Sequence, residues 1–361
     1  MKKKILLLLS LLILLSLSAC TGSVGATSWP GISLSPDGEL AYVAYNQQVY
    51  AIQVGSGTAY PGYAFPEKPG AAVMFYAPPL VTEDGRLIAA GYDKMLHVAN
   101  ADSGKDDQVI LQAQNRFISS PLLLNDVVYI SSSDERVYAV DLDGNPVWDE
   151  PFQANQAIWS TPASSADGAT LYVTSMDHYL YALDAETGAE LWQREMGGAS
   201  AGTPTVTEDG RLFLGTLNNE VLGVDASSSE IFLRIPTEGW VWSSPILHEN
   251  VLYFADLKGY IYAADSQNGE ILWQIQPDGP ITAPALMAGE LLYFATESGS
   301  VVAVNLQGEV QWNETVGGKL YSSMVATDQH LLVGAIENDS FLIALNLQTG
   351  LKVWVYPQPE N

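Results

Sequence analysis

One motif recurs along nearly the whole sequence with a period of about 41 residues. Its clearest mark is a proline that follows small residues, as in Ser119-Ser120-Pro121. Successive prolines of this kind are 41, 42, 41 and 39 residues apart, and they are Pro121, Pro162, Pro204, Pro245 and Pro284. A unit of this length cannot bury its apolar face alone, so neighbouring units must stack on one another. The sequence therefore predicts one domain built from repeats, although 361 residues would ordinarily form two or three domains.

Each repeat is predicted to contain four short strands separated by turns. The third strand is the most regular, as in Leu180-Tyr181-Ala182-Leu183, and seven of its eight copies carry Ala or Gly at the third position, where sheets must stack closely. The copies span residues 49–52, 96–99, 137–140, 180–183, 221–224, 261–264, 301–304 and 342–345. Four strands in about 40 residues are typical of a β-propeller blade. We therefore expect an all-β fold, an eight-bladed β-propeller of four-stranded antiparallel blades.

The fourth strand carries tryptophan at a fixed distance from a glycine. Five of the nine tryptophans follow a glycine by four residues, and they are Trp148, Trp192, Trp273, Trp312 and Trp354. Side chains of this size are expected to dock between neighbouring blades, each burying about 150–250 Å². Pro61, Gln108 and Leu233 occupy the same position in three other repeats, which are expected to form weaker seams. Since the repeats begin on a first strand and end on a fourth, the last blade is expected to pack on the first without an exchanged strand.

The segment from Asp184 to Trp192 resembles the tryptophan-docking motif of the PQQ-binding-like β-propeller repeat family. The segments Asp265 to Trp273 and Asn346 to Trp354 match it with small departures. The resemblance covers residues 29–357 and implies eight blades, in agreement with the repeat count. It also implies one of two kinds of protein, either a quinoprotein dehydrogenase or a non-enzymatic lipoprotein similar to BamB, the propeller subunit of the outer-membrane β-barrel assembly machine.

The first residues have the layout of a secretory signal. Lysines at positions 2–4 precede an apolar run over residues 5–19, which spans only about 22 Å as a helix and is too short for a hydrocarbon core of about 30 Å. The run ends in Leu-Ser-Ala-Cys at Cys20, a tetrapeptide that resembles the bacterial lipobox. This implies cleavage before Cys20 and a lipid on it, which would anchor the protein outside the cytoplasm, at the outer face of the cytoplasmic membrane or the periplasmic face of an outer membrane. The expected segments are a signal peptide over 1–19, a flexible tether over 20–28 and the propeller over 29–361.

Charge and cysteine content exclude several classes of function. The 15 Lys and Arg residues against 41 Asp and Glu give a formal charge of -26, which repels phosphate backbones and excludes nucleic-acid binding as the main activity. A single cysteine excludes an intrachain disulfide and a multi-cysteine metal site. It also excludes the adjacent-cysteine disulfide of many quinoprotein dehydrogenases, and no segment matches the calcium ligands of those enzymes. We therefore expect neither PQQ nor calcium as a cofactor, and no enzymatic activity.

Surface recognition is the function that these exclusions leave. The four histidines, His97, His178, His248 and His330, fall in different repeats, so neither a metal site nor a catalytic triad is expected, and no catalytic residue is assigned. Aromatic residues cluster just before the proline-anchored strands, on the segments that join one blade to the next. The candidates for contact with a partner are Phe75, Tyr76, Trp159, Trp240, Trp242 and Tyr321. The long segment over residues 59–72 is a second candidate contact.

We expect a monomeric, lipid-anchored propeller that binds a protein partner without doing chemistry. In a cell with an outer membrane, the partner would be a β-barrel assembly subunit or unfolded barrel strands. Two other functions stay open. One is an extracytoplasmic propeller that binds or senses a ligand, and the other is a PQQ- and calcium-dependent dehydrogenase.

Overall fold

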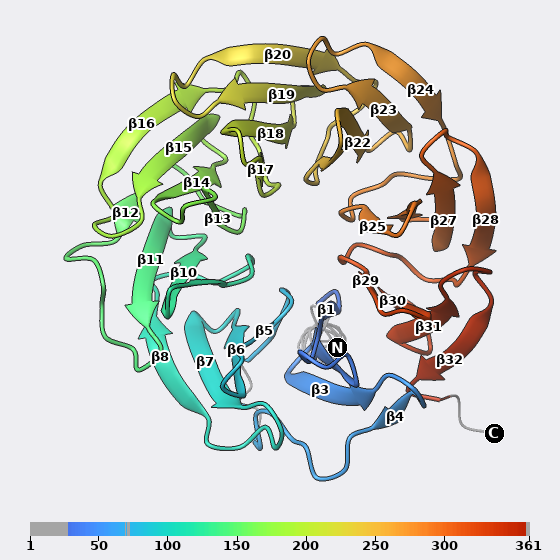
Figure 1. The fold of residues 1–361 in the computed structure, drawn as a ribbon. Helices are drawn as coiled ribbons and strands as arrows, with labels where there is room; N and C mark the ends of the chain where they lie inside the picture. Colours follow the sequence, from blue (N-terminus) through green and yellow to red (C-terminus); the bar gives the residue numbers. More distant parts are fainter. Residues whose placement is uncertain (1–27, 69, 71–72, 359–361) are drawn as a thin grey trace, which may run out of the picture.

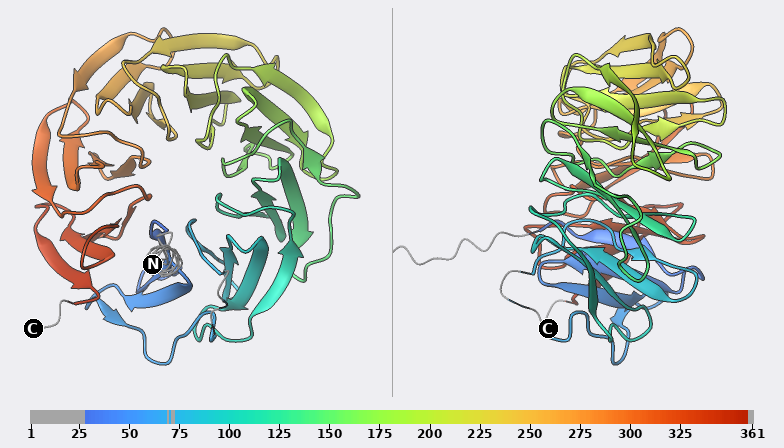
Figure 2. Two further views of the ribbon diagram at one scale, coloured as in Figure 1. Left: turned by 180° about the vertical axis from the view of Figure 1, so that it is seen from behind. Right: turned by 90° about the vertical axis from the view of Figure 1, so that its left-hand side faces the viewer.

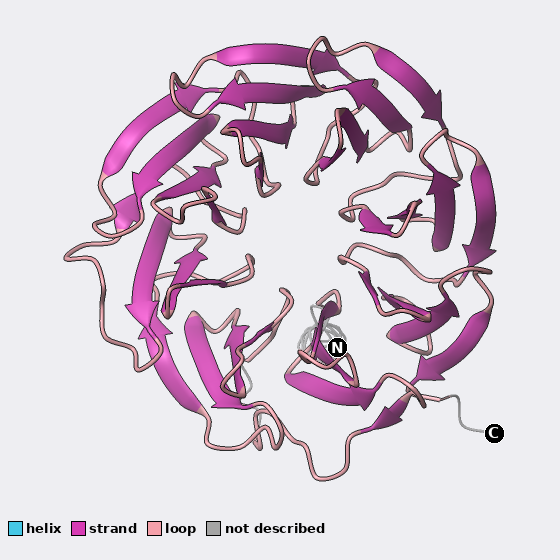
Figure 3. Ribbon diagram, in the orientation of Figure 1, coloured by secondary structure: helices cyan, strands magenta, loops and turns pink. Residues whose placement is uncertain are grey.

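The computed structural model describes residues 28–68, 70 and 73–358, in which the chain forms β-strands and no helix (Figure 3). Cys20 and the predicted signal peptide lie outside the described residues. The strands form eight four-stranded antiparallel sheets, arranged as blades around a central axis (Figure 1). The predicted eight-bladed β-propeller is therefore confirmed. No membrane-spanning helix occurs in the part of the chain that the structure describes.

The first four blades follow one another along the chain. Blade 1 consists of β1 (Gly31–Leu34), β2 (Leu40–Tyr45), β3 (Gln48–Gln53) and β4 (Thr58–Ala59). Blade 2 consists of β5 (Leu80–Val81), β6 (Arg86–Ala90), β7 (Met95–Asn100) and β8 (Gln108–Gln112). Blade 3 consists of β9 (Leu122–Leu124), β10 (Val127–Ser131), β11 (Arg136–Asp141) and β12 (Phe152–Gln153). Blade 4 consists of β13 (Ala163–Ser164), β14 (Thr170–Thr174), β15 (Tyr179–Asp184) and β16 (Glu190–Glu195).

The other four blades complete the ring. Blade 5 consists of β17 (Thr205–Val206), β18 (Arg211–Thr216), β19 (Glu220–Asp225) and β20 (Ile231–Pro236). Blade 6 consists of β21 (Ile246–His248), β22 (Val251–Ala255), β23 (Ile261–Asp265) and β24 (Ile271–Ile275). Blade 7 consists of β25 (Leu286–Ala288), β26 (Leu291–Ala295), β27 (Ser300–Asn305) and β28 (Val310–Thr315). Blade 8 consists of β29 (Val325–Ala326), β30 (His330–Gly334), β31 (Leu342–Asn346) and β32 (Lys352–Tyr356).

The ring closes by packing, as the sequence predicts. Each blade pairs only its own consecutive strands, so blades 1 and 8 exchange none. The Trp354 indole Nε1 of blade 8 donates a hydrogen bond of 2.8 Å to the Val54 carbonyl of blade 1. First strands lie near the axis and fourth strands on the circumference, and the molecule is a disc when seen from the side (Figure 2). The first strands are only two to four residues long, so residues near the axis come largely from the segments between blades.

The fourth strand of blade 3 departs from the prediction. The repeat predicts this strand from Gly144 to Trp148, but β12 begins only at Phe152. Pro146 and Pro151 flank the tryptophan, and proline has no backbone N–H for a ladder hydrogen bond. The Trp148 side chain is nevertheless only 4% exposed and packs in the apolar core between blades 3 and 4. The tryptophan therefore docks without a strand to carry it.

Candidate functional site

The segments that join one blade to the next, here called connectors, lie on one face of the ring with the turns between second and third strands. Backbone hydrogen bonds tie the two together, since the Met176 N–H in a turn of blade 4 donates to the Ala157 carbonyl of a connector, and the Leu257 N–H of blade 6 donates to the Trp240 carbonyl. We call this side of the disc the connector face. The remaining turns lie on the opposite face.

Each of the seven connectors, and the segment that leads into β1, ends in an extended stretch in which consecutive side chains point to opposite sides. The first residue is buried between blades, at Ser28, Phe75, Phe117, Ile158, Ser200, Val241, Ile281 and Leu320. The second faces the central axis, at Trp29, Tyr76, Ile118, Trp159, Ala201, Trp242, Thr282 and Tyr321. We call these eight axial side chains the upper ring. Five of them are aromatic.

The upper ring surrounds a central cavity of about 520 Å³. Two residues further along each connector, a second ring of small side chains lines the same cavity: Gly31, Pro78, Ser120, Thr161, Thr203, Ser244, Pro284 and Ser323. Tyr92 from the turn between β6 and β7 and Arg116 from the next connector complete one side. Arg116 is the only charged side chain among the described residues that line the cavity. The cavity lining is therefore positively charged, although the chain as a whole has 41 acidic residues and a formal charge of -26.

The aromatic side chains form two groups across the cavity. Trp29 contacts Tyr76 edge to face with ring centroids 5.2 Å apart, and Tyr76 contacts Tyr92 at 5.0 Å. The Arg116 guanidinium lies 4.5 Å above the Tyr92 ring and donates a hydrogen bond to its hydroxyl. In the second group, Trp159 and Trp242 meet at 6.1 Å across blade 5. They can approach because the intervening blade contributes only Ala201 to the upper ring.

The structure brings four of the six predicted contact residues together. Tyr76, Trp159, Trp242 and Tyr321 all line the cavity. Trp240 lies outside it, on the connector face, with half of its side chain exposed. The prediction for Phe75 is wrong, because this ring is fully buried between blades 1 and 2. The alternation along the connector explains the error, since neighbouring residues in an extended chain cannot both face the axis.

The sequence prediction misses Trp29, Tyr92 and Arg116, the other large aromatic or charged residues of the lining. Trp29 is in the upper ring but precedes a Pro-Gly pair, so the proline motif that marks the other connectors does not reveal it. Tyr92 and Arg116 belong to a turn and to the middle of a connector, where the repeat has no fixed pattern. The repeat did carry a signal for Trp29. Ser33 pairs with Tyr42 in blade 1 as Ile246 pairs with Tyr253 in blade 6, so Ser33 and Ile246 are equivalent positions. Counting back four residues from each gives Trp29 and Trp242.

The proline alignment itself needs one correction, in blade 7. Leu286 pairs with Tyr293 in the same way that Ile246 pairs with Tyr253 in blade 6. Ala285 therefore occupies the position of Pro245, and Pro284 stands one residue earlier, in the second ring of the cavity. The equivalent residues Tyr253 and Tyr293 are 40 residues apart, so the offset of Pro284 by one residue accounts for the spacing of 39. The same offset explains why Thr282 rather than Ile281 lies in the upper ring.

Aspartate side chains anchor the connectors through hydrogen bonds. The Asp177 Oδ2 atom accepts hydrogen bonds from the Tyr181 hydroxyl at 2.7 Å and from the Asn155 N–H at 2.9 Å. Asp256 holds Tyr262 and a connector N–H at Gly239 with the same geometry, at 2.8 Å each. Each aspartate thus joins a third strand to the preceding connector and holds the axial side chains in place.

His97 replaces the tyrosine of this arrangement in blade 2. Its Nε2 lies 3.0 Å from Asp93 Oδ2 and its Nδ1 lies 3.2 Å from Asp107 Oδ1. Burial by itself lowers the pKa of His97, but the hydrogen bonds to Asp107 and Asp93 outweigh it and raise the pKa to about 9. The ring is therefore an imidazolium that donates to both carboxylates. It packs on Phe65 and Phe75 at the seam between blades 1 and 2.

The other three histidines stay apart, as expected. His178 lies in a turn of blade 4, His248 ends β21 in blade 6, and His330 begins β30 in blade 8. Within the described ranges, no three His, Cys, Asp or Glu side chains are grouped closely enough to hold a metal ion. Asp, Glu and Asn side chains are the usual protein ligands of Ca²⁺, and the described cavity lining contains none of them. These residues do not fit a calcium-bound quinone.

The predicted docking tryptophans contact the next blade in a common way. The Nε1 atoms of Trp148, Trp192 and Trp273 donate to the carbonyls of Ala185, Ala226 and Leu306, at 3.0, 3.0 and 2.9 Å. Trp148 and Trp273 also cover the turn glycine of the next blade: a Cβ on Gly188 would lie 2.5 Å from Trp148, with φ of 74°. The turn facing Trp192 has Ser229 in this place, with φ of 58°. Trp312 covers Gly350 but has no hydrogen bond at Nε1, and the Tyr293 hydroxyl donates to the corresponding Leu347 carbonyl at 3.1 Å.

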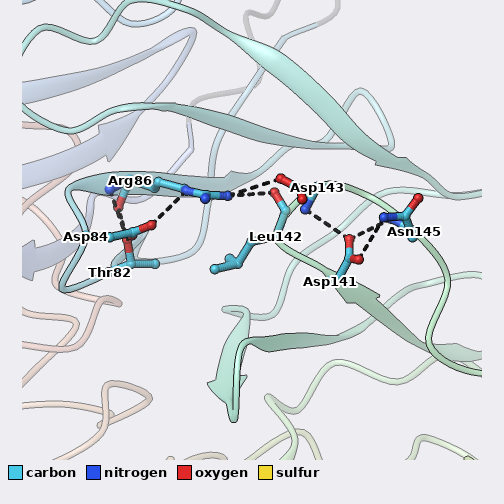
Figure 4. Close-up of polar contacts among 7 residues, drawn as sticks. All are labelled: Thr82, Asp84, Arg86, Asp141, Leu142, Asp143 and Asn145. Atoms are coloured by element: carbon cyan, nitrogen blue, oxygen red, sulfur yellow. Dashed lines mark hydrogen bonds and ion pairs between the residues drawn. The ribbon is translucent and has the colours of Figure 1, made fainter.

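The three seams without tryptophan use other residues. In blade 2, Ile110 rather than Gln108 covers Gly144, and the Arg86 Nη1 atom donates to the Leu142 carbonyl at 3.0 Å (Figure 4). In blade 5, Leu233 covers Gly269, as its place in the repeat predicts. Arg211 of that blade reaches Ser266 Oγ of blade 6 at 3.4 Å.

In blade 1, Pro61 is exposed, and Gly104 is covered by the Ala64 carbonyl together with the Cβ of the fully buried Phe65. Pro61 therefore lies outside the seam, whereas Gln108 does take the tryptophan position, opposite Val98, although Ile110 makes the contact. Part of the predicted contact segment over 59–72 is also structural, since Phe65 belongs to the wall between blades 1 and 2.

Comparison with known proteins gives one family and one fold. A family model described as outer membrane protein assembly factor BamB matches residues 46–199, 176–319 and 279–361. The crystal structure of BamB from Moraxella catarrhalis has a TM-score of 0.70 at 16% sequence identity, over 84% of this chain and 92% of that one. The crystal structure of the computationally designed Ika8 protein has a TM-score of 0.71 at 12% identity, over 92% of this chain and 98% of that one. No curated protein matches the chain in sequence. At these identities the structural matches establish the fold alone.

Proposed function

Because this chain belongs to the family of the outer membrane protein assembly factor BamB, whose model matches residues 46–361 in overlapping segments, we propose that it is a non-enzymatic propeller lipoprotein that binds protein partners outside the cytoplasm. In a cell with an outer membrane, the proposed partner is a β-barrel assembly subunit or an unfolded barrel strand. The protein acts as a monomeric propeller and uses neither PQQ nor calcium in this proposal.

One observation carries the partner contact. Trp240 lies on the connector face with half of its side chain exposed, although large apolar residues are normally buried. Its backbone is held in place, because its carbonyl accepts a hydrogen bond from Leu257 and the preceding Gly239 N–H donates to Asp256. A large aromatic ring on a fixed backbone loses little conformational entropy on binding, and tryptophan is enriched in interface hot spots.

The tether proposed for Cys20 would orient this face. Ser28 is eight positions after Cys20, a stretch that spans at most about 28 Å when fully extended. Ser28 is buried on the connector face, where its Oγ accepts a hydrogen bond of 2.6 Å from the Asn46 N–H. A lipid on Cys20 would therefore hold the connector face toward the membrane. The proposed partner then lies at the membrane surface, within reach of Trp240.

Photocrosslinking tests the partner contact. A photoreactive amino acid at position 240, in the lipidated protein in membranes of its own cells, is expected to crosslink a single membrane-associated protein. The same amino acid at Phe232, whose ring is 42% exposed on the outer strand of blade 5, serves as the matched control and is expected to give no such product. Equal crosslinking at both positions, or a position-240 product without any barrel-assembly subunit, would contradict the proposal.

Membrane fractionation tests the anchor separately. The Cys20→Ala variant is expected to lose the lipid and to appear in the soluble fraction. If it is retained in the membrane fraction and uncleaved, the proposed lipoprotein maturation is wrong.

A further inference from the structure

We propose that the central cavity binds an acidic carbohydrate, a function beyond the protein-binding role proposed above. Four of the aromatic residues that the sequence predicts to contact a partner line this cavity: Tyr76, Trp159, Trp242 and Tyr321. At about 520 Å³, the cavity has the size of small-molecule sites in proteins, which range over about 300–1,000 Å³. A short saccharide is a ligand of this size.

The charge of the cavity lining favours a negatively charged ligand. The chain carries a formal charge of -26, yet the described lining has no carboxylate and a single cation, Arg116. No carboxylate of the described residues forms an ion pair with this guanidinium, which is held by the Tyr92 ring and hydroxyl. Its Nε atom is buried and has no hydrogen-bond partner among those residues. An arginine fixed in this way presents its remaining N–H groups to a ligand carboxylate.

The aromatic groups favour a ligand with flat apolar faces. Trp159 and Trp242 form a tilted pair on one side, while Trp29 and Tyr76 line the other. Their indole and phenol rings present broad apolar surfaces toward the axis and are partly exposed there. The C–H faces of a pyranose ring are apolar and flat, so each can lie against such a ring.

Hydroxyl groups supply the polar contacts that a saccharide needs. Five of the eight side chains in the second ring are Ser or Thr: Ser120, Thr161, Thr203, Ser244 and Ser323. Above them, the hydroxyl of Thr282 in the upper ring is buried and has no hydrogen-bond partner in the described part of the chain. A hydroxyl both donates and accepts, so these groups match a ligand that is itself rich in hydroxyls.

An extended peptide fits this cavity less well. A peptide strand is recognised through a long free sheet edge, which supplies a row of backbone hydrogen bonds. The strands nearest the axis are two to four residues long, such as β13 (Ala163–Ser164) and β17 (Thr205–Val206). The cavity thus offers side chains rather than backbone, which again favours the saccharide.

Isothermal titration calorimetry and tryptophan fluorescence on the full chain in detergent test the inference. Trigalacturonic acid is expected to bind and to change the tryptophan emission, and its fully methyl-esterified form, which has no charge, is expected to bind at least tenfold more weakly. Arg116→Gln should bring both forms to the same weak affinity. Arg234→Gln, which removes an exposed arginine paired with Glu220 on the circumference, is the matched control and should change neither.

A second variant separates the contribution of the aromatic rings to binding from that of the Arg116 charge. Trp159→Ala is expected to weaken both forms by at least tenfold, with unchanged circular dichroism showing that the propeller is folded. No saturable binding of either form, equal binding of acid and ester, or an Arg116→Gln variant that still prefers the acid would each overturn the inference. The partner contact is read out independently, because Arg116→Gln should leave crosslinking at position 240 intact.

Discussion

The seam between blades 6 and 7 and the seam between blades 2 and 3 are sealed by different side chains that reach the same backbone position. In the first, Trp273 donates from its indole to the Leu306 carbonyl and covers Gly308. In the second, Arg86 donates to the Leu142 carbonyl, and Ile110 covers Gly144. One tryptophan thus does in blade 6 what an arginine and an isoleucine do together in blade 2.

The comparison extends around the ring. The corresponding carbonyls of Val54, Ala101, Ala185, Ala226 and Leu347 also accept a hydrogen bond from the preceding blade, from tryptophan or tyrosine side chains. A buried carbonyl without a partner costs about 1–3 kcal/mol, which explains why seven of the eight seams supply a donor to it. In the seam between blades 5 and 6, Arg211 reaches the Ser266 hydroxyl instead. What the repeat requires is a donor and an apolar cover at this position, and tryptophan is the one residue that provides both.

The largest expected effect is the loss of a docking tryptophan. Trp273→Ala removes both the cover and the donor, and should lower the free energy of unfolding by about 3–5 kcal/mol. Leu233→Ala, the matched change in a seam without tryptophan, removes only the cover and should cost about 2 kcal/mol. Urea denaturation of the two variants measures the difference, and equal losses would show that the tryptophan seams have no special weight.

The seam between blades 1 and 2 contains the His97 imidazolium, and it should respond to pH. The folded-state pKa is raised to about 9 from an ordinary value of 6.5, so its stabilisation is complete below about pH 6.5 and disappears as the pH rises through about 9. The free energy of unfolding should fall by about 2–3 kcal/mol between pH 7 and pH 10 because the ring loses its proton. His97→Gln should abolish this component, and an unchanged pH profile in that variant would refute the assignment.

A smaller effect separates backbone strain from the clash with tryptophan. Gly38 and Gly188 both have φ near 73°, but a Cβ at Gly38 would meet nothing within 4 Å, whereas at Gly188 it would meet the Trp148 ring. Gly38→Ala should cost about 1 kcal/mol from the left-handed backbone alone. Gly188→Ala should cost roughly 1–2 kcal/mol more from overpacking. Equal melting temperatures of the two variants would mean that the indole can move aside.

The arginine seam should show a more modest loss. Arg86→Met keeps the apolar stem but leaves the Leu142 carbonyl without its donor, and should destabilise the protein by about 1 kcal/mol. Arg234→Met, which removes an exposed ion pair with Glu220, should change the stability by less than about 0.5 kcal/mol. Thermal unfolding of both variants tests whether Arg86 acts as a seam residue, and indistinguishable curves would count against it.

The smallest effect is expected where the repeat and the structure disagree. Pro61 stands in the tryptophan position of the sequence repeat, yet it is exposed, and Phe65 is fully buried in its place. Pro61→Ala should therefore change the stability by less than about 0.5 kcal/mol. Phe65→Ala should cost about 3–5 kcal/mol. A reversed order in calorimetry would restore Pro61 to the seam.

The sequence by itself determined the number of blades, the four strands in each, the mode of closure and the docking tryptophans. These features depend on short-range patterns, because strand alternation and glycine turns are written within a few residues and then repeated. Deviations within one repeat escaped for the same reason. The prolines around Trp148 break a strand, and the long connector of blade 1 replaces Pro61 by Phe65.

Only the tertiary structure decided which side chains meet at the axis and at the seams. Phe75 and Tyr76 are adjacent in sequence, but one is buried in the wall and the other lines the cavity. Arg86 finds its acceptor 56 residues away in the next blade, and Trp29 meets Tyr321 because the ring closes. Such contacts depend on the curvature of the whole ring, which brings seven distant connectors and the segment before β1 to one axis, and no local pattern records that distance.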